Sequence, residues 1–525
     1  LAKAIPNVLN MKLLGALSAS KQLRQMYDGD ERIKRVIDTA MALEDMPKDS
    51  GTHAAGIVIT RDPVYTYVPL ALSKKDNTIA TQYTMTTLEE LGLLKMDFLG
   101  LRNLTIIDDA VKDIQRTVPD FDIKTIPDDD QEVYDMLSTG RTSGVFQLES
   151  TGMTGVCTGL KPKSIEDITA VIALYRPGPM DSIPRFIESA SNPEKITYKH
   201  PLLEPILNIT YGCIVYQEQV IEIFRRLGGF SLGQADMIRR AMSKKKQAEI
   251  IKERDTFING DPNRGIPGAV KNGVPADIAG SIYDEILDFA NYAFNKAHAV
   301  SYAIVAYETA YLKCHYPRQY MAALMSSVLD QPEKVSEYTA ECSQLGIKLL
   351  PPNINKSENR FTVEGNNIRY GLVAVKNIGG KFIENVMEQR AQGGEFTSFF
   401  DFCERMYGAD MNRRALESLI KCGAFDGLGA NRRQLMEVCG STIDSIADAR
   451  RKNVEGQMDL FGGSDSDNTP QLAIKLPNLP EYSSGEMMAM EREVTGLFLS
   501  GHPMDSYRRA ARNLGAVTIG SILSD

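Results

Sequence analysis

Apolar residues recur at helical spacing along most of the chain, and short strand-like runs interrupt this pattern at a few places. Three long ranges show the helical spacing: residues 1–49, 104–344 and 381–450. The runs at residues 57–59 and 92–101 are typical of strands, and short strands are also expected between residues 345 and 380. The pattern predicts an α+β fold that is mostly α-helical.

The strand-like stretch at residues 92–101 brings two charged side chains together. Side chains alternate between the two faces of a strand, so Lys95 and Asp97 share one face. Met96 and Phe98 share the other face, which we expect to be buried. A carboxylate can hold Mg²⁺, and an ammonium beside it can bind a phosphate. The alternative is a strand whose polar face is simply solvated, and the residues alone favour that alternative.

A run of positive charge stands out in a chain that is acidic as a whole. Five cations lie within eight residues: Arg239, Arg240, Lys244, Lys245 and Lys246. Such a cluster suits a triphosphate or the backbone of a nucleic acid. A solvated helix face explains it equally well, because charge runs are common on helix surfaces.

Aromatic and basic residues alternate between residues 292 and 302. Tyr292 and Phe294 can stack on a base or a ribose. Lys296 and His298 can donate hydrogen bonds to a phosphate. The alternative is a core helix whose histidine has a hydrogen-bond partner, and for His298 taken by itself this is the better interpretation.

Two glycine-containing turns, at residues 375–386 and 419–429, each lead into a helical stretch. Such a turn directs backbone N–H groups toward a DNA phosphate, and its glycines let the backbone approach closely. The candidate DNA contacts of the first turn are Lys376, Gly379, Gly380 and Lys381. One such turn commonly joins two helices, but a pair indicates a tandem helix-hairpin-helix region that grips duplex DNA.

Residues 451–485 form a polar, acidic stretch that is typical of a linker. Gln457, Leu460 and Phe461 lie within it. An exposed Leu-Phe pair in a flexible segment has no core to join, so it predicts a short peptide that docks into the pocket of a partner. Gln457 can add a hydrogen bond beside it.

Composition narrows the class of protein. The chain has 525 residues, a net charge of −9, and 43 % hydrophobic and 24 % charged residues, as in an ordinary globular protein of three or four domains. Any contact with nucleic acid must therefore use local basic patches. The seven cysteines form no CxxC pair, and we find no signal peptide or spanning segment. We therefore expect a cytoplasmic protein with no membrane partner.

The two ends of the sequence look cut. The chain begins at Leu1 rather than Met, and it stops at Asp525 just after a strand-like apolar run. We therefore expect it to be a piece of a longer protein.

Several ordered stretches together resemble the C-family bacterial replicative polymerases, the family of the DNA polymerase III alpha subunit. They are residues 51–59, 95–101 (sequence KMDFLGL), 144–150, 175–179, 211–219, 239–242 and 294–298. The resemblance covers essentially the whole chain. The parts that it implies are residues 1–49 as the end of the thumb, 50–101 as the last part of a nucleotidyltransferase palm, 102–344 as large helical fingers, 345–450 as the tandem helix-hairpin-helix region that binds duplex DNA, 451–485 as the linker with a clamp-binding motif, and 486–525 as the connection to an OB-fold module.

The resemblance also implies roles for the candidate residues. Asp97 matches the third of the three palm carboxylates that bind two Mg²⁺ in this family, so it is the implied catalytic and metal-binding residue. The positions that match the surroundings of the incoming triphosphate are Lys95, Arg239, Arg240, Lys296 and His298, with Tyr292 a candidate contact to the sugar or base. The segment from Gln457 to Phe461 matches the motif that binds the sliding clamp. The implied partners are primer-template DNA, deoxynucleoside triphosphates (dNTPs), the sliding clamp, the clamp loader and other replicase subunits.

One departure from the family pattern changes the expected activity. The other two palm carboxylates of the family form an Asp-x-Asp pair upstream of the thumb, and this chain has no matching segment. A two-metal site needs several carboxylates, so the Mg²⁺ site is incomplete here. We expect the parent protein to be a DNA-directed DNA polymerase and this chain alone to be inactive. The alternative function is a non-catalytic DNA-binding protein that is tethered to the sliding clamp.

Overall fold

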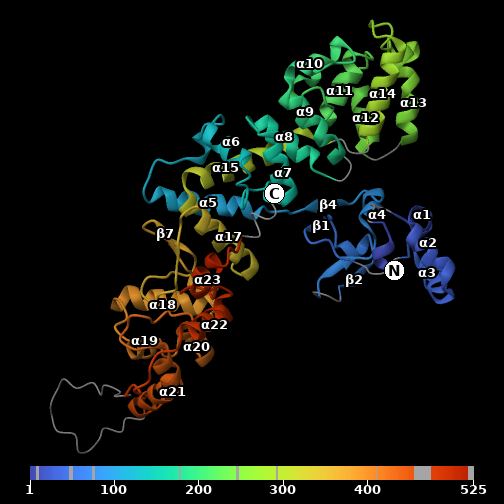
Figure 1. Ribbon diagram of the computed structural model, residues 1–525. Coiled ribbons are helices and arrows are strands. Elements are labelled where there is room, and N and C mark those ends of the chain that lie inside the picture. The colour runs from blue at the N-terminus through green and yellow to red at the C-terminus, as the bar shows by residue number, and fades with distance from the viewer. Residues whose placement is uncertain are drawn as a thin grey trace, which may run out of the picture. The chain divides into compact units, whose positions relative to one another are not determined.

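The computed structural model describes residues 1–6, 11–46, 51–73, 77–176, 179–243, 247–290, 294–409, 411–454 and 475–517. The chain divides into two compact units, residues 1–100 and residues 101–525 (Figure 1). The fold is α+β and mostly helical, so the fold class predicted from the sequence is confirmed.

The first unit begins with three short helices, α1 (Leu13–Ala19), α2 (Lys21–Gly29) and α3 (Glu31–Leu43). Polar residues cap the N-termini of α2 and α3. The side chains of Ser20 and Asp30 accept hydrogen bonds from backbone N–H groups in the first turns of these helices. The apolar faces of the helices meet in a small core of Ala16, Leu17, Leu23 and Ile37. The helices expected within residues 1–49 are therefore present.

Two small antiparallel sheets follow in the first unit. Strand β1 (Gly56–Ile59) pairs with β4 (Leu94–Asp97), and β2 (Leu70–Leu72) pairs with β3 (Ile79–Thr81). Helix α4 (Met85–Glu90) lies between β3 and β4 in sequence. The register places Gly56 opposite Asp97 and Val58 opposite Lys95.

The expected burial of β4 is wrong, although the expected alternation is right. Met96 is 43 % exposed and Phe98 is 61 % exposed. The Lys95 side chain is only 12 % exposed. The reason is that Lys95 and Val58 face a cavity that β2, β3 and α4 help to close, whereas no layer of the described part of this unit covers Met96. Apolar alternation shows which side chains share a face, but not which face another layer covers.

Three hydrophobic cores lie in the described part of the second unit. One is built by α6 (Gln131–Ser138), α7 (Thr151–Leu160), α8 (Ile165–Leu174), α9 (Ile183–Ser191) and α15 (Lys296–His315). Ala299, Ala303, Ala306 and Ala310 form a fully buried stripe of small residues along α15. Small side chains allow close approach of another backbone, so α15 packs tightly on α8, whose residues are buried from Asp167 to Leu174.

A second core holds the helices between these elements. They are α10 (Glu204–Leu207), α11 (Gln217–Arg226), α12 (Leu232–Ser243), α13 (Gln247–Asn259) and α14 (Ala276–Ala290). Phe224 lies at its centre and contacts the rings of Phe230, Phe257 and Tyr283 in edge-on geometry. Helix α12, which carries Arg239 and Arg240, packs in this core.

The third core is the largest and joins distant parts of the sequence. Its helices are α5 (Arg102–Gln115), α16 (Pro317–Ser326), α17 (Pro332–Gln344), α18 (Gly380–Gly393), α19 (Phe399–Arg405), α20 (Arg413–Lys421), α21 (Arg432–Val454) and α22 (Ser484–Thr495). A three-stranded sheet of order β5-β7-β6 packs with them, formed by β5 (Leu349–Leu350), β6 (Thr362–Glu364) and β7 (Asn367–Arg369). The short strands expected between residues 345 and 380 are therefore present.

The remaining elements are short. Helix α23 (Arg508–Asn513) follows α22. The 3-10 helices are Ala2–Ala4, Val64–Thr66, Ile123–Thr125, Pro179–Ser182, Pro193–Lys195, Pro201–Leu203, Asn208–Thr210, Pro262–Arg264, Leu372–Ala374 and Asp505–Tyr507. Across the described ranges, we find no helix with the length and apolar character needed to cross a membrane.

Candidate functional site

Asp97 ends β4, and its carboxylate lies among a lysine, a histidine and a glycine. Lys95 Nζ donates a hydrogen bond to Asp97 Oδ1, and His53 Nδ1 lies 3.9 Å from the same oxygen. Gly56 faces this group across the β1–β4 ladder. A Cβ atom on Gly56 would lie 2.7 Å from Lys95 Cε and 3.1 Å from Asp97 Oδ1, so a larger residue at this position would force the Lys95 side chain to move.

The surroundings of Asp97 keep it ionised. The hydrogen bond from Lys95, helped by the charge of Lys95, holds the pKa of the Asp97 carboxyl below its ordinary value. His53 Nδ1 accepts a hydrogen bond from the N–H of Ala55 at 3.2 Å, which assigns the neutral ring's proton to Nε2. Asp97 is therefore an exposed carboxylate that an incoming cation can reach, beside an ammonium that can meet an anion.

This arrangement fits a Mg²⁺ site only in part. Mg²⁺ prefers oxygen ligands in octahedral geometry, and Asp97 supplies that chemistry. In the part of the chain that the structure describes, no group of three metal-binding side chains includes Asp97. Further oxygen ligands for a divalent cation must come from water, a substrate phosphate or other carboxylates.

The side chain of Lys95 also borders a cavity of about 670 Å³ in the first unit. Strands β1, β2 and β3 and helix α4 line it, mostly with apolar side chains such as Val58, Leu70 and Leu88. His53 lies at its edge. The cavity places an apolar surface next to the charged group.

The basic cluster lies on α12, where the structure describes only its first two members. Arg239 Nε and Arg240 Nε bind the two oxygens of Asp236 at 2.7 and 2.8 Å. The hydrogen bond from Arg239 is the main cause that lowers the pKa of Asp236. The Arg240 side chain is 70 % exposed and that of Arg239 29 %, so Arg240 is the more accessible cation. Lys244, Lys245 and Lys246 lie outside the described residues.

The start of α15 places Lys296 between two acidic residues. Asn295 caps the helix by accepting the N–H of His298 at 2.9 Å. Glu218 of α11 accepts hydrogen bonds from Lys296 N at 3.0 Å and from the Asn295 amide at 2.9 Å. Lys296 Nζ pairs with Glu166 of α8 at 3.1 Å. Carboxylates thus occupy the positive end of this helix, where a phosphate would also be stabilised.

A row of rings continues from this helix start. Phe294, His298 and Tyr302 are spaced four residues apart, and their neighbouring ring centroids lie 5.4 and 4.3 Å from one another. Tyr302 also contacts Phe146 at 5.3 Å, and the Arg176 guanidinium lies over the Phe294 ring at 4.2 Å. Burial lowers the pKa of Arg176. His298 is exposed and stacked on other rings, which differs from the alternative of a buried core histidine.

Sequence reasoning missed Arg176, Phe146 and Tyr302 as members of this group. The spacing of Phe294, His298 and Tyr302 was the available signal, because residues four apart share a helix face. Tyr292 lies outside the described residues, so its predicted contact stays a prediction. Helix α12, which carries Arg239 and Arg240, packs in a different hydrophobic core from α15.

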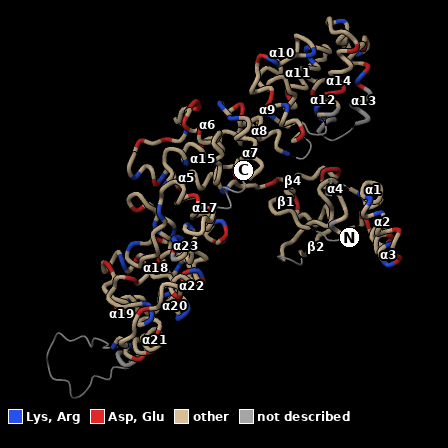
Figure 2. Tube along the Cα trace, in the orientation of Figure 1, with Lys and Arg blue, Asp and Glu red and all other residues tan. Residues whose placement is uncertain are grey.

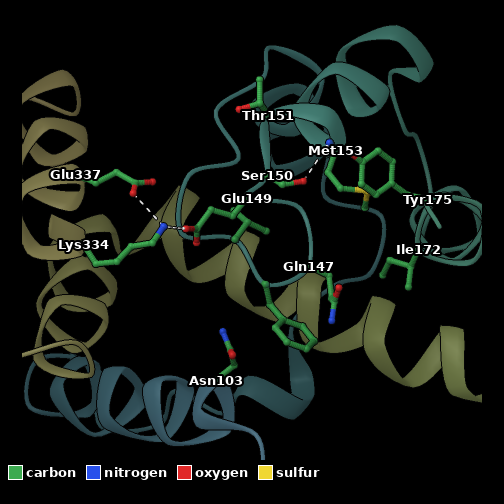
Figure 3. Close-up of a pocket in the computed structure, with 12 residues that line it drawn as sticks. Asn103, Gln147, Glu149, Ser150, Thr151, Met153, Ile172, Tyr175, Lys334 and Glu337 are labelled. Carbon is green, nitrogen blue, oxygen red and sulfur yellow. Dashed lines mark hydrogen bonds and ion pairs between the residues drawn. The ribbon is translucent and has the colours of Figure 1, made fainter. Parts of the chain in front are cut away.

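A second cavity, of about 730 Å³, lies in the second unit (Figure 3). Figure 3 shows Lys334 and Glu337 of α17 on one side and Tyr175 on the other. Lys334 binds Glu149 and also Glu337, the latter at 2.9 Å, and the hydrogen bond to Glu149 raises the pKa of Lys334. Phe146, which stacks on Tyr302, belongs to the cavity wall. The cavity therefore adjoins the aromatic row.

The first glycine turn presents an open backbone at the start of α18. Gly379 is the N-cap residue, and nothing lies within 4 Å of a Cβ built on either Gly379 or Gly380. The preceding element is a 3-10 helix rather than an α-helix. Lys376 Nζ donates to the carbonyl of Glu493 at 2.8 Å, so α22 holds this predicted DNA contact, while Lys381 is exposed.

The second turn, between α20 and α21, rests on a buried charge network. Arg432 binds Asp426 at 2.7 Å and the fully buried Glu491 at 3.0 Å. These partners raise the pKa of Arg432, although burial opposes the shift. Gly423 has φ +81°, and a Cβ there would lie 2.3 Å from Arg432 Nη2. The turn therefore requires glycine for both its backbone conformation and its space.

The two turns belong to one packed body. The Asn377 amide of the first turn donates to Ser418 Oγ of α20 at 3.1 Å. Helix α22 closes the group, since Glu491 also accepts the N–H groups of Leu499 and Ser500 at 2.9 Å. Helix α22 thus packs in the same core as α20, although it follows the predicted linker in sequence.

Figure 2 shows basic and acidic residues interspersed along the chain, in keeping with its net charge of −9. The predicted clamp-binding residues Gln457, Leu460 and Phe461 lie outside the described residues.

Three protein-family models match segments of the chain. The model of the bacterial DNA polymerase III alpha NTPase domain matches residues 1–100, which hold Lys95 and Asp97. The model of the bacterial DNA polymerase III alpha subunit finger domain matches residues 103–265, and a helix-hairpin-helix motif matches residues 346–435. These matches define the class as a bacterial DNA polymerase subunit.

Individual relatives agree with this assignment. The chain is 41 % identical over 519 residues to the DNA polymerase III subunit alpha of Borreliella burgdorferi. It is 42 % identical over 517 residues to that of Thermus aquaticus and 39 % identical over 533 residues to that of Escherichia coli. These alignments cover 97–99 % of the chain but only 41–45 % of each relative. The chain belongs to the DNA polymerase III alpha subunit family and spans less than half the length of these relatives.

Proposed function

We propose that the protein of which this chain is a part carries out template-directed DNA synthesis, transferring deoxynucleotides from dNTPs to a primer 3′-hydroxyl. The observation that carries this proposal is the Lys95–Asp97 pair over Gly56, in the segment that matches the NTPase domain of the family. A carboxylate beside an ammonium suits a reaction in which a cation and a phosphate meet at one place.

In this proposal, Asp97 is a ligand of Mg²⁺, and two bound Mg²⁺ ions would activate the 3′-hydroxyl and offset charge on the phosphates. Lys95 now donates its hydrogen bond to Asp97. Asp97 would hold the cation, and the Lys95 ammonium would bind the triphosphate. Because Gly56 has no Cβ atom, the side chains of Lys95 and Asp97 can both lie close to its backbone.

The fingers would bind the triphosphate by a similar exchange of ion pairs. Lys296 is held by Glu166, and Arg240 by Asp236, in pairs whose basic members remain partly exposed. Because partly exposed ion pairs are weak, a triphosphate with several negative charges can compete with one carboxylate. Arg239 and His298 would act beside them, and Tyr292 would contact the sugar or base.

The tandem turns would hold the product duplex. The backbone at Gly379 and Gly380 is open at a helix start, which is suited to a phosphate, and Lys381 adds an exposed cation. Lys376 would contribute to DNA binding while it anchors the turn to α22. Gln457, Leu460 and Phe461 would bind the sliding clamp, and the clamp loader and other replicase subunits would be further partners in the cytoplasm.

The chain by itself would be inactive, because Asp97 is one carboxylate of a site that needs several. The test compares primer extension by the longer parent protein and by this chain. In the parent, Asp97→Asn is expected to lower kcat by about 10²- to 10³-fold, because it removes several kcal/mol of metal-assisted stabilisation. Asp28→Asn, which alters an exposed ion pair on α2, is the matched control.

Two outcomes would contradict this proposal. Extension by the isolated chain that Asp97→Asn abolishes would show that the site is complete without further carboxylates. Full activity of the parent with Asp97→Asn would remove Asp97 from the catalytic machinery.

A non-catalytic DNA-binding, clamp-tethered protein is the second candidate. Among the described residues, Asp97 belongs to no group of three metal-binding side chains, and this observation favours the second candidate. Only the polymerase proposal expects dNTPs with Mg²⁺ to protect Arg239 and Lys296 from chemical modification. Modification rates that dNTPs leave unchanged would favour the second candidate.

A further inference from the structure

A cluster of metal-binding side chains lies in the second unit, whereas Asp97 belongs to the first. The ligand atoms of Glu132, Cys314 and His315 all lie within 4.8 Å of one another. Cys314 and His315 are at the C-terminal end of α15, and Glu132 is in the first turn of α6. The cluster thus connects two helices that are far apart in sequence and pack against each other.

Asp130 orients the histidine of this cluster. Asp130 Oδ2 lies 2.9 Å from His315 Nε2, and Oδ1 accepts the N–H groups of Glu132 and Val133 at the start of α6. Tyr311 stacks on the His315 ring with centroids 4.5 Å apart. When His315 donates its Nε2–H to Asp130, the lone pair of the neutral His315 ring is on Nδ1, and Nδ1 can coordinate a metal ion.

Packing fixes the position of Asp130 in turn. Tyr307 of α15 donates its hydroxyl proton to the carbonyl of Pro127 at 2.7 Å and accepts the N–H of Asp130 at 3.3 Å. The carboxylate that orients His315 is therefore held by the same helix that carries His315. Such support is typical of the residues around metal ligands in proteins.

The donor set selects one class of metal. A thiolate sulfur, an imidazole nitrogen and a carboxylate oxygen suit Zn²⁺, whereas Mg²⁺ and Ca²⁺ prefer oxygen alone. The thiolate and the carboxylate together balance the charge of a divalent ion. Bond lengths of about 2.0–2.3 Å place tetrahedral ligands about 3.3–3.8 Å apart, so a small side-chain movement brings the three ligands to a metal. Glu132 is exposed and can make that movement.

We propose that Glu132, Cys314 and His315 bind a Zn²⁺ ion, with water in the fourth position, and that Asp130 is the positioning residue of His315. Binding forms three protein–zinc bonds and releases the thiol proton of Cys314 to water. The ion ties the end of α15 to the start of α6. Because Lys296 and His298 are at the other end of α15, the ion would stabilise the helix that presents them. The proposal does not depend on polymerase activity.

The test uses the full chain, purified with a non-thiol reductant, stripped of metal and titrated with Co²⁺ and then Zn²⁺. Co²⁺ is the probe because a cobalt–thiolate bond gives a near-ultraviolet charge-transfer band and tetrahedral Co²⁺ gives strong visible bands. We expect one Co²⁺ per chain with both features, displaced by Zn²⁺. Cys314→Ser abolishes the thiolate band, and Glu132→Gln and His315→Gln weaken binding.

Asp130→Asn tests the positioning role. Asparagine still caps a helix, but its amide cannot accept the Nε2 proton from the same position, so the proton moves to Nδ1. We expect zinc affinity to fall about 10- to 100-fold while the thiolate band remains. Cys213→Ser, at a buried cysteine outside the cluster, is the matched control and is expected to leave both metals bound.

Circular dichroism without metal checks that each variant is folded, and the exposed Glu132 makes Glu132→Gln the variant that perturbs folding least. Absence of the thiolate band in the unmodified chain overturns the proposal. Bands that persist in Cys314→Ser, or that Cys213→Ser abolishes, also overturn it.

Discussion

Gly56 lies directly opposite Asp97 in the β1–β4 ladder, and the missing side chain of Gly56 leaves the space in which Lys95 reaches the Asp97 carboxylate. A Cβ atom there would lie within 3.1 Å of both side chains and 3.0 Å from His53. The geometry of the candidate metal site thus depends on a residue that contributes no functional group.

Gly56→Ala is therefore expected to disable the site while largely preserving the fold. The added methyl group displaces Lys95 or Asp97, and overpacking of this kind costs about 1–3 kcal/mol. Primer extension by the parent protein should fall at least about tenfold, with a smaller effect on thermal unfolding. Gly29→Ala is the control, because nothing lies within 4 Å of its added Cβ. Equal activity of the two variants would contradict the role given to Gly56.

The pKa of Asp97 should respond to Lys95. Since the hydrogen bond from Lys95 lowers this pKa, Lys95→Met should raise it toward the ordinary value of about 3.9. A lowered pKa in the folded state stabilises the fold above the unfolded pKa, and this contribution is lost as the pH falls through the folded pKa. In Lys95→Met this contribution to stability should be smaller, and it should be lost at a higher pH because the folded-state pKa of Asp97 is higher. Carboxyl-carbon NMR titration of the full chain, with the signal assigned by Asp97→Asn, measures the shift, and an unchanged pKa contradicts it.

The buried pair of Arg432 and Glu491 should be essential for the stability of the tandem turns. Arg432→Met leaves the fully buried Glu491 carboxylate without this partner, which is expected to cost about 3–5 kcal/mol. Urea unfolding followed by circular dichroism measures the change. Arg433→Met, next in sequence and exposed, should cost less than about 1 kcal/mol. Similar losses for both variants would show that burial of the ion pair is not decisive.

The affinity for duplex DNA should fall steeply as the salt concentration rises, and it should depend on a few individual cations. The net charge of −9 opposes DNA overall, so the contacts must come from a few cations. Lys381→Ala should weaken binding and reduce the slope of log K against log salt by about 1, as expected for one phosphate contact. Lys195→Ala, in the 3-10 helix Pro193–Lys195, should leave the slope unchanged. Fluorescence anisotropy at several salt concentrations measures both.

Binding of the sliding clamp should be separable from DNA binding. Replacing Leu460 and Phe461 with alanine removes the apolar side chains of the proposed docking peptide, so clamp binding should be abolished. Affinity for short primer-template DNA should be unchanged, because the peptide is distant in sequence from the first glycine turn. Surface plasmon resonance with immobilised clamp measures the first effect. Unchanged clamp affinity would remove the assignment of Gln457, Leu460 and Phe461.

Local sequence determined the parts of the candidate sites whose residues are close along the chain. Strand alternation put Lys95 and Asp97 on one face, and their hydrogen bond follows from that spacing. The glycine turns could also be predicted from the sequence, because a turn such as that at Gly423 needs a backbone conformation that other residues rarely adopt. The mostly helical fold followed from the spacing of apolar residues over long ranges.

Only the tertiary structure decided which surfaces are covered and which distant side chains meet. The alternation along the strand predicts that Met96 is a core residue, but Met96 is exposed. Burial depends on whether another layer of the fold covers that face. The DNA contact of Lys376 stays a prediction, and only the structure shows that Lys376 also donates to the Glu493 carbonyl of α22. Glu132 meets Cys314 only because α6 packs on α15. Periodicity is a property of neighbouring residues, whereas burial and long-range contacts depend on how whole elements pack.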